Sequence, residues 1–286
     1  MTTSIVSHAD FVINLFCIVD DLKRMVDRHL IGKKDGRKTV LTDSECITVA
    51  ILRWKVGSTS WKAFYREVLP FYRPYFPHLP EYANFIEHIH RVTPLINRIL
   101  PLLLQFARSE GEHHIYFIDS TPLPVCNVKR INSHKVAKDF ASRKKSTMGW
   151  FYGFKLHAIC DTEGRLVSIQ LTTGSLDDRA PVLNLIKGLS GILIADAGYL
   201  GEELQAKLRE AGIHFQTASR KNMNKLMTRL QHFLFNQRQV IERVFASLKY
   251  RFGLDLSLSR SINGMFATIL TALAFYQIKT AVLAVS

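Results

Sequence analysis

Cysteine is scarce in this sequence of 286 residues, and its four cysteines form no closely spaced pair. Cys17, Cys46, Cys126 and Cys160 are scattered along the chain, which argues against a zinc ribbon and against a disulfide framework. No cluster of histidine and cysteine indicates a zinc site either. This cysteine usage is typical of a reducing compartment, so we expect a cytoplasmic protein.

The sequence also has no segment that predicts export or membrane insertion. The N-terminal MTTSIVSHADF lacks a basic region followed by an apolar run, so we expect no signal peptide. The most apolar stretch, residues 264–285, is interrupted at Gln277 and Lys279, and it falls short of the roughly 20 apolar residues that a membrane span needs. We therefore expect a buried C-terminal helix and no membrane partner.

Two common enzyme signatures are missing as well. The sequence contains no Walker-type glycine loop and no GxSxG motif, which removes the commonest nucleotide-hydrolase and serine-hydrolase interpretations. What the chain has in excess is positive charge, with 38 Lys and Arg against 24 Asp and Glu and a formal net charge of +14. Such an excess attracts polyanions and releases their counterions, so nucleic acid is the leading candidate partner.

Residues 1–108 predict a succession of helices, because their apolar positions follow helical spacing. Thr42 and Glu45 have the spacing of a capping box at the start of one helix. A later helix should be kinked or interrupted at Pro94 and Pro101. Short helices joined by basic loops suit a plain helical bundle or a DNA-binding region of helix-turn-helix type, and we expect the latter.

After residue 112 the pattern changes from helices to strands that later alternate with helices. Two strand-like runs surround the turn DTEG and predict a hairpin. Segments of both kinds then alternate as far as HFQTAS. The order predicts an α/β domain over residues 109–286, with a mixed sheet flanked by helices. It is compatible with an RNase H-like core, although periodicity alone does not single that fold out.

Two buried strands are predicted to end in a carboxylate, Asp119 in YFID and Asp196 in LIAD. A carboxylate at the carboxyl end of a buried strand is costly unless it meets a cation or a partner, and α/β sheets bind ligands at this edge. One such aspartate often only caps the following turn, but two in one sheet favour a shared site. Asp177 and Asp178 are rivals for a metal role, and we interpret them as a helix cap.

A third acidic candidate lies in a helix predicted over residues 235–251. At about 100° per residue, Arg238, Glu242 and Lys249 fall within about 40° of one another, beside an apolar stripe that would pack on the sheet. In an isolated helix this pattern indicates a surface ion-pair ladder. Combined with the two strand-end aspartates, it instead predicts three carboxylates that converge on metal ions, with both cations facing phosphate groups.

Phosphodiester chemistry explains why carboxylates would converge in this way. The reaction needs an activated oxygen nucleophile, neutralised charge on the phosphoryl group and a stabilised leaving oxygen, and two divalent ions about 3.5–4 Å apart supply all three. Mg²⁺ prefers oxygen ligands and keeps several waters, so a few carboxylates from separate segments suffice to hold it.

Several motifs together resemble bacterial insertion-sequence transposases with a DDE catalytic triad. They are IDST, GWFYGFKLH, GSLDDR, IADAGY and the helix that carries Arg238, Glu242 and Lys249. The resemblance covers roughly residues 112–283 and is closest to groups with the signature Tyr-x2-Arg-x3-Glu-x6-Lys. Phe235 stands in the place of the tyrosine, so the hydroxyl of that signature is missing here.

The resemblance implies an RNase H-like core in which Asp119, Asp196 and Glu242 hold two Mg²⁺ ions, with Mn²⁺ as a substitute. It implies cleavage at insertion-sequence ends and transfer of the freed 3′-hydroxyl into target DNA. The implied partners are double-stranded DNA, as terminal inverted repeats and target, and a second copy of the chain, in a bacterial cytoplasm near the nucleoid. A nuclease of similar fold and a catalytically silent DNA-binding descendant are the alternatives.

Basic side chains close in sequence to these carboxylates are expected to contact DNA phosphates. They are Lys129, Arg130, Arg143, Lys144, Lys145, Arg220, Lys221, Arg238 and Lys249. Trp150 could stack on a base, but we expect a tryptophan at the start of a strand to lie in the core. His157 is expected to be structural.

Overall fold

The computed structural model describes residues 8–28, 39–109, 115–146, 149–217, 229–255 and 259–283. Its contacts divide the chain into two compact units. The first comprises Met1–Leu103 and Asn263–Ile278, and the second comprises Leu104–Ile262 and Lys279–Ser286. The division differs from the expected one at the C-terminal helix, which groups with the N-terminal helices.

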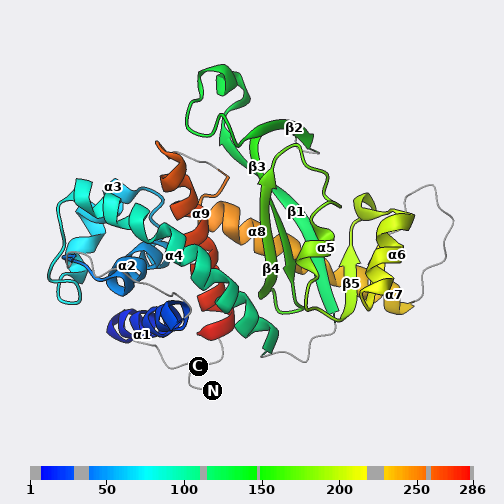
Figure 1. Cartoon of the computed structure of the whole chain (residues 1–286), viewed down its shortest axis with the longest axis horizontal. Coiled ribbons are helices and arrows are strands. Elements are labelled where there is room, and N and C mark those ends of the chain that lie inside the picture. The colour runs from blue at the N-terminus through cyan, green and yellow to red at the C-terminus, as the bar shows by residue number, and fades with distance from the viewer. Residues whose placement is uncertain are drawn as a thin grey trace. The chain divides into compact units, whose positions relative to one another are not determined.

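The described part of the first unit consists of helices and the turns and loops that join them (Figure 1). Its helices are α1 (His8–Arg28), α2 (Asp43–Lys55), α3 (Trp61–Ala63), α4 (Tyr82–Ser109) and α9 (Ile262–Gln277); a π turn (Phe64–Val68) and a 3-10 turn (Leu69–Tyr72) follow α3. Of the expected kink or interruption in α4, the interruption is absent: the helix runs continuously through Pro94 and Pro101. Its apolar face is buried, including Ile96 and Leu103, and this burial outweighs the two lost backbone hydrogen bonds.

Two features of the first unit agree with the sequence. The Thr42 side chain accepts from the Glu45 N–H while the Glu45 side chain accepts from the Thr42 N–H, so the predicted capping box is confirmed. One helical stretch, Ile262–Val282, is long and apolar enough by composition to cross a membrane, but 67% of its apolar window is buried inside the protein. A side-chain hydrogen bond of 2.9 Å from Trp54 Nε1 to Thr271 Oγ1 fixes this helix to α2.

The second unit is built on a mixed, six-stranded sheet (Figure 1). The strands are β1 (Ile115–Cys126), β2 (Ser142–Ser146), β3 (Gly149–Cys160), β4 (Leu166–Thr173), β5 (Gly191–Ala195) and β6 (Ile213–Thr217). β3 pairs antiparallel with β1 on one edge and with β2 and then β4 on the other, which confirms the predicted hairpin. β1, β5 and β6 pair in parallel. This is the RNase H-like arrangement that the sequence predicted.

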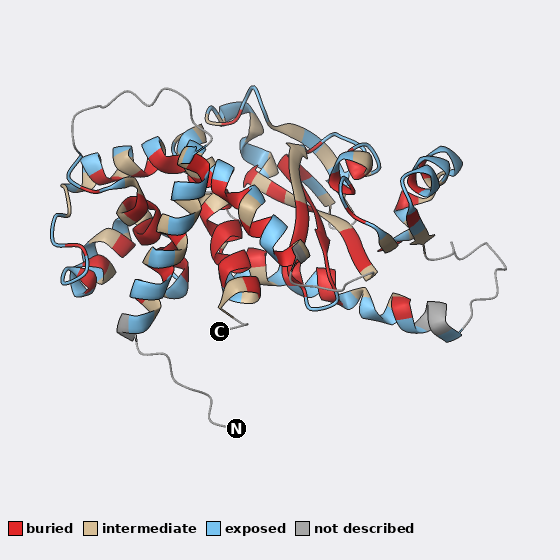
Figure 2. Cartoon of the chain, turned by 60° about the horizontal axis from the view of Figure 1, so that its bottom comes forward, coloured by how far each residue is buried: buried red, intermediate tan, exposed pale blue. Residues whose placement is uncertain are grey.

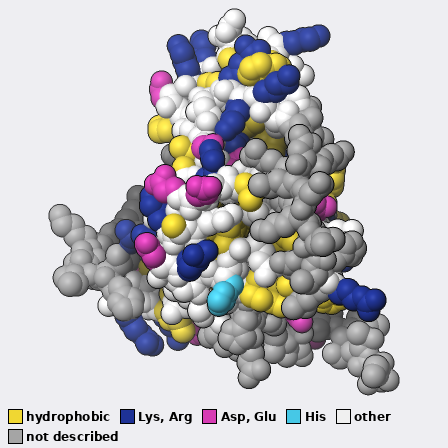
Figure 3. Space-filling model, turned by 90° about the vertical axis from the view of Figure 1, so that its right-hand side faces the viewer, with side chains coloured by type: hydrophobic (Ala, Val, Ile, Leu, Met, Phe, Trp, Pro, Cys, Tyr) yellow, Lys and Arg dark blue, Asp and Glu magenta, His cyan; other side chains and the backbone are white. Residues whose placement is uncertain are grey.

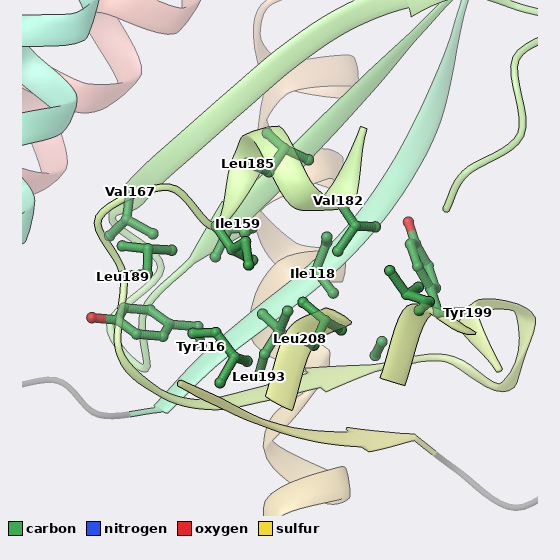
Figure 4. Close-up of a cluster of buried hydrophobic side chains, with 14 residues drawn as sticks. Tyr116, Ile118, Ile159, Val167, Val182, Leu185, Leu189, Leu193, Tyr199 and Leu208 are labelled. Atoms are coloured by element: carbon green, nitrogen blue, oxygen red, sulfur yellow. The ribbon is translucent and has the colours of Figure 1, made fainter. Parts of the chain in front are cut away.

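Helices cover both faces of the sheet. α5 (Val182–Leu185) and α6 (Glu202–Glu210) bury one face, where Ile118 and Leu193 from the strands meet Leu185 and Leu208 from the helices (Figure 4). α8 (Gln239–Ala246), which follows α7 (Arg229–Gln237), packs on β1 and β3 from the other face (Figure 1). β3 is accordingly buried over most of its length and β1 and β5 in part, whereas β2 and β6 and the outer surfaces of the helices are more exposed (Figure 2).

Two predicted helices are shorter than expected. The helix expected from DDRAPVLNLIKGL is restricted to α5, and the one expected over residues 235–251 is broken at Arg238 and ends in a π turn, Ser247–Arg251. Lys249 lies within this π turn, which contains more residues than an α turn, so the α-helical spacing used to align it with Glu242 does not apply there.

The capping box supplies a test of the first unit. Thr42→Ala should lower the free energy of unfolding by about 1 kcal/mol. The Glu45 N–H loses its acceptor, and the Glu45 side chain that accepts from the residue 42 N–H loses its contact with the Thr42 hydroxyl. Urea unfolding followed by circular dichroism measures the change. Glu45→Gln is the control, since glutamine keeps the acceptor at this position. Equal losses in the two variants would contradict the capping role of Thr42.

Candidate active site

The alternation of side chains along the strands places both strand-borne aspartates on one face. Ile118 and Ala195 belong to the hydrophobic cluster under α5 and α6. Because successive side chains of a strand point to opposite faces, Asp119 and Asp196 lie on the face covered by α8. Asp196 follows the last residue of β5 with an extended backbone (φ −69°, ψ 162°), so the alternation continues to it.

The register brings the same two residues side by side. The last parallel pair between β1 and β5 is Phe117 with Ile194, and each aspartate lies two residues beyond it. Asp196 is at a strand end as predicted, but Asp119 is not, because β1 continues to Cys126. Beyond Phe117, β1 loses its pairing with β5 and keeps only that with β3. The two carboxylates therefore flank the point where two parallel strands part.

The helical carboxylate, Glu242, joins them through an arginine. Arg238 Nη2 donates to Glu242 Oε1 at 2.8 Å, and Arg238 Nη1 lies 3.7 Å from Asp196 Oδ2. The second distance is an ion pair rather than a hydrogen bond. The Arg238 guanidinium thus pairs with a carboxylate at the end of β5 and with one on α8. α8 packs on the sheet through buried residues such as Ile241 and Val244.

Asp119 differs from the other two carboxylates in its surroundings. Burial raises its pKa to about 6, although the Ser120 N–H and the nearby Arg238 oppose the rise, and the charges of Asp196 and Asp178 add to it. Ser120 N donates to Asp119 Oδ1 at 2.8 Å. Among the described residues no cation lies within ion-pair distance of Asp119. It is a partly buried carboxylate that, in the part of the chain that the structure describes, feels the charge of Arg238 without forming an ion pair.

The described residues contain no group of three Asp, Glu, His or Cys side chains close enough, as they stand, to hold a metal ion. The donor set nevertheless fits one. Asp119, Asp196 and Glu242 carry three negative charges against the single positive charge of Arg238, which leaves two charges for a divalent cation. The side chains of Asp196 and Glu242 are 56% and 54% exposed, so a cation can reach their oxygens from solvent. Oxygen donors alone suit Mg²⁺.

The aspartate pair of GSLDDR does not cap a helix as expected. α5 begins after Pro181, with no side-chain cap. Asp177 accepts from the Arg179 backbone N–H and guanidinium and so closes a surface turn; these hydrogen bonds lower its pKa to about 2. Asp178 instead points to β1 and β3. Its Oδ1 accepts from Ser120 Oγ at 2.8 Å and from Lys155 Nζ at 2.6 Å.

Sequence reasoning missed Lys155, although the signal was present. The residue stands inside the strand-like run FYGFKLHAIC, where a lone cation requires a partner because its burial is costly. The side chain is only 7% exposed. Its neighbour on the same face, His157, is buried, contacts Thr172 Oγ1 at 2.9 Å, and has a pKa lowered by burial to about 4. His157 is therefore neutral, which agrees with a structural role.

The basic residues of β2 lie on two faces of the β2–β3 hairpin. The register pairs Arg143 with Tyr152 and Lys145 with Trp150, so these side chains share one face. Trp150 is 52% exposed, with the Arg143 guanidinium 4.4 Å from its ring centroid, so the expectation of a core tryptophan is wrong. Lys144 faces the other way and donates to the carbonyls of residues 175 and 176.

The remaining basic candidates are dispersed. Lys129 and Arg130 are exposed in a 3-10 turn, Val128–Ser133, before β2. Figure 3 shows Lys and Arg side chains gathered at the top of the view, where the loop between β1 and β2 lies in Figure 1. Lys249 is partly buried, which lowers its pKa, and its charged neighbour is Asp255 rather than Glu242. Arg220 and Lys221 lie outside the described residues.

Comparison with known proteins supports a transposase fold. No curated protein matches the chain. A cryo-EM structure of a piggyBac transposase synaptic complex with hairpin DNA is similar to it, with a TM-score of 0.51, 10% sequence identity, and coverage of 94% of this chain and 73% of that chain. At this identity the likeness concerns the fold alone. The family model described as a transposase DDE domain matches residues 109–262, more than half of the sequence, and these residues include all three carboxylates. The chain therefore belongs to the transposase DDE domain family.

Proposed function

We propose that this chain is a DNA transposase with Asp119, Asp196 and Glu242 as its catalytic carboxylates. The observation that carries the proposal is the position of the two aspartates, both two residues past the last β1–β5 pair, with Arg238 between Asp196 and Glu242. Members of the transposase DDE domain family generally use a divalent metal. The reaction proposed is cleavage at insertion-sequence ends followed by transfer of the freed 3′-hydroxyl into target DNA.

Each residue of the proposed site would have its own role in the reaction. Two Mg²⁺ ions, when bound, would activate the attacking oxygen and neutralise charge on the phosphoryl group. Asp119 would present a carboxylate held by the Ser120 N–H, and Asp196 and Glu242 would supply oxygens that are exposed to solvent. The Arg238 guanidinium, which pairs with Asp196 and Glu242 in the structure, would be placed to bind a DNA phosphate. Water and then the 3′-hydroxyl would be the successive nucleophiles.

The proposal extends to the partners of the site. Exposed Lys129, Arg130, Arg143 and Lys145 would bind phosphates of the transposon end or of target DNA, and the helical residues 1–108 would bind the end sequence. Bringing two ends together requires two copies of the catalytic unit, so we include a homodimer on DNA. The affiliation with the Tyr-Arg-Glu-Lys groups and a place at the bacterial nucleoid belong to the same proposal.

A strand-transfer assay tests the reaction. The protein is incubated with DNA that carries the inverted repeats flanking its own gene, with target plasmid and with Mg²⁺, and the products are separated by size. Joined donor and target are expected. Cleaved ends without joining would point to a nuclease of the same fold, and metal-independent binding without cleavage would point to a silent DNA-binding descendant.

The catalytic carboxylates give the first prediction about activity. Asp119→Ala, Asp196→Ala and Glu242→Ala should each abolish cleavage and leave most of the DNA affinity, because phosphate contacts to basic side chains supply that affinity. Gel electrophoresis of end cleavage and fluorescence anisotropy measure the two effects. Asp177→Ala is the matched control, since the Asp177 carboxylate accepts hydrogen bonds from Arg179 in the surface turn. A fully active variant would remove its residue from the site.

The hairpin gives a second prediction, because its three consecutive basic residues face different ways. Arg143→Ala and Lys145→Ala should each reduce the slope of log K against log salt by about 0.9, the contribution of one phosphate. Lys144→Ala should leave the slope unchanged, because its amine already donates to two backbone carbonyls. Fluorescence anisotropy titrations at salt concentrations from about 50 to about 200 mM give the binding constants from which each slope is obtained. Equal slopes in all three variants would contradict a hairpin face that binds DNA.

A further inference from the structure

A chain of polar contacts joins the loop before α5 to the residue that follows Asp119. Lys155 Nζ donates to Asp178 Oδ1 at 2.6 Å and to the Leu176 carbonyl at 3.2 Å. The same Asp178 oxygen accepts from Ser120 Oγ at 2.8 Å, and Ser120 N donates to Asp119 Oδ1 at 2.8 Å. The contacts cross the sheet, because the Ser120 side chain lies on the α5 and α6 face while Asp119 lies on the α8 face.

These contacts act where β1 is least restrained. Pairing with β5 ends at Phe117, so Asp119 and Ser120 are held by β3 alone on one edge of the strand. Where pairing with β5 is absent, the Asp178 carboxylate restrains β1 by accepting a hydrogen bond from the Ser120 hydroxyl. Lys155 is a buried cation on β3, and its ion-pair partner is Asp178. Removal of the Asp178 carboxylate would leave the buried charge of Lys155 without this partner, which is costly. The loop carboxylate is therefore fixed to the sheet and can in turn fix Ser120.

Resting on the function proposed above, we infer that Asp178 and Lys155 are positioning residues, which hold Ser120 and so orient the Asp119 carboxylate for a divalent cation. Asp178 is not itself a ligand in this arrangement. Its Oδ1 is shared by two donors and its charge is offset by Lys155, which explains how a fourth carboxylate lies so near the site without joining it. Partners behind a metal ligand commonly change metal affinity about 10- to 100-fold when they are removed.

The test is direct Mn²⁺ binding by the full-length protein without DNA, measured from the electron paramagnetic resonance signal of the free ion. Ser120→Ala and Asp178→Asn should each raise the Mn²⁺ dissociation constant by about 10-fold or more. Ser120→Thr should restore a value close to that of the unaltered protein, because it keeps the hydroxyl. Asp177→Asn, one residue away with its carboxylate bound to Arg179, should have no effect.

The outcomes separate this inference from the proposed function. Asp119→Asn should abolish Mn²⁺ binding; if it does not, the proposed metal site is wrong. If Asp119→Asn abolishes binding but Ser120→Ala and Asp178→Asn bind Mn²⁺ as the unaltered protein does, only the positioning role is overturned. Should Asp178→Asn fail to fold, the comparison of Ser120→Ala with Ser120→Thr decides, since neither disturbs the buried Lys155. End cleavage at increasing Mg²⁺ should then recover in Ser120→Ala but not in Asp119→Asn.

Discussion

The separation of β1 from β5 is the constraint on which the rest of the second unit depends. Up to Phe117 and Ile194 the backbones of the two strands are paired by hydrogen bonds, and beyond that pair this pairing ends. Because side chains alternate with a period of two, one register decides that Asp119 and Asp196 emerge on the same face. A shift of a single residue in either strand would send one carboxylate into the hydrophobic cluster under α5 and α6. The apolar pairs that fix this register therefore also fix the site.

Charge compensation then divides the carboxylates between the two faces of the sheet. Lys155 on β3 neutralises Asp178 on the α5 side, whereas Arg238 is shared between Asp196 and Glu242 on the α8 side. In the first pair the Lys155 side chain is buried and the Asp178 side chain is 36% exposed, and we propose that this pair positions Ser120. The second group has more exposed carboxylates and carries more negative than positive charge once Asp119 is counted. The sheet thus separates the proposed support from the face that is proposed to accept a cation.

Much of this arrangement could be predicted from local patterns, and the remainder depends on contacts distant in sequence. The apolar runs before Asp119 and Asp196 correctly predicted two strands of one sheet, since burial and alternation are visible in consecutive residues. The continuation of β1 past Asp119 was missed because it depends on antiparallel pairing with β3, whose paired residues are 26 to 37 positions away in sequence. Trp150 was assigned to the core because a propensity cannot show that its strand begins on an exposed hairpin. The break at Arg238 likewise has no local signal that we can identify.

The strand β3 relates the basic hairpin to the carboxylates. Trp150 at its start shares a face with the exposed cations, and Ala158 further along is paired directly with Asp119. Eight residues of extended strand span about 27 Å, which corresponds to about eight nucleotide steps of B-form DNA. If the hairpin binds phosphates as proposed, one rigid element sets how far those contacts lie from the phosphodiester being cut.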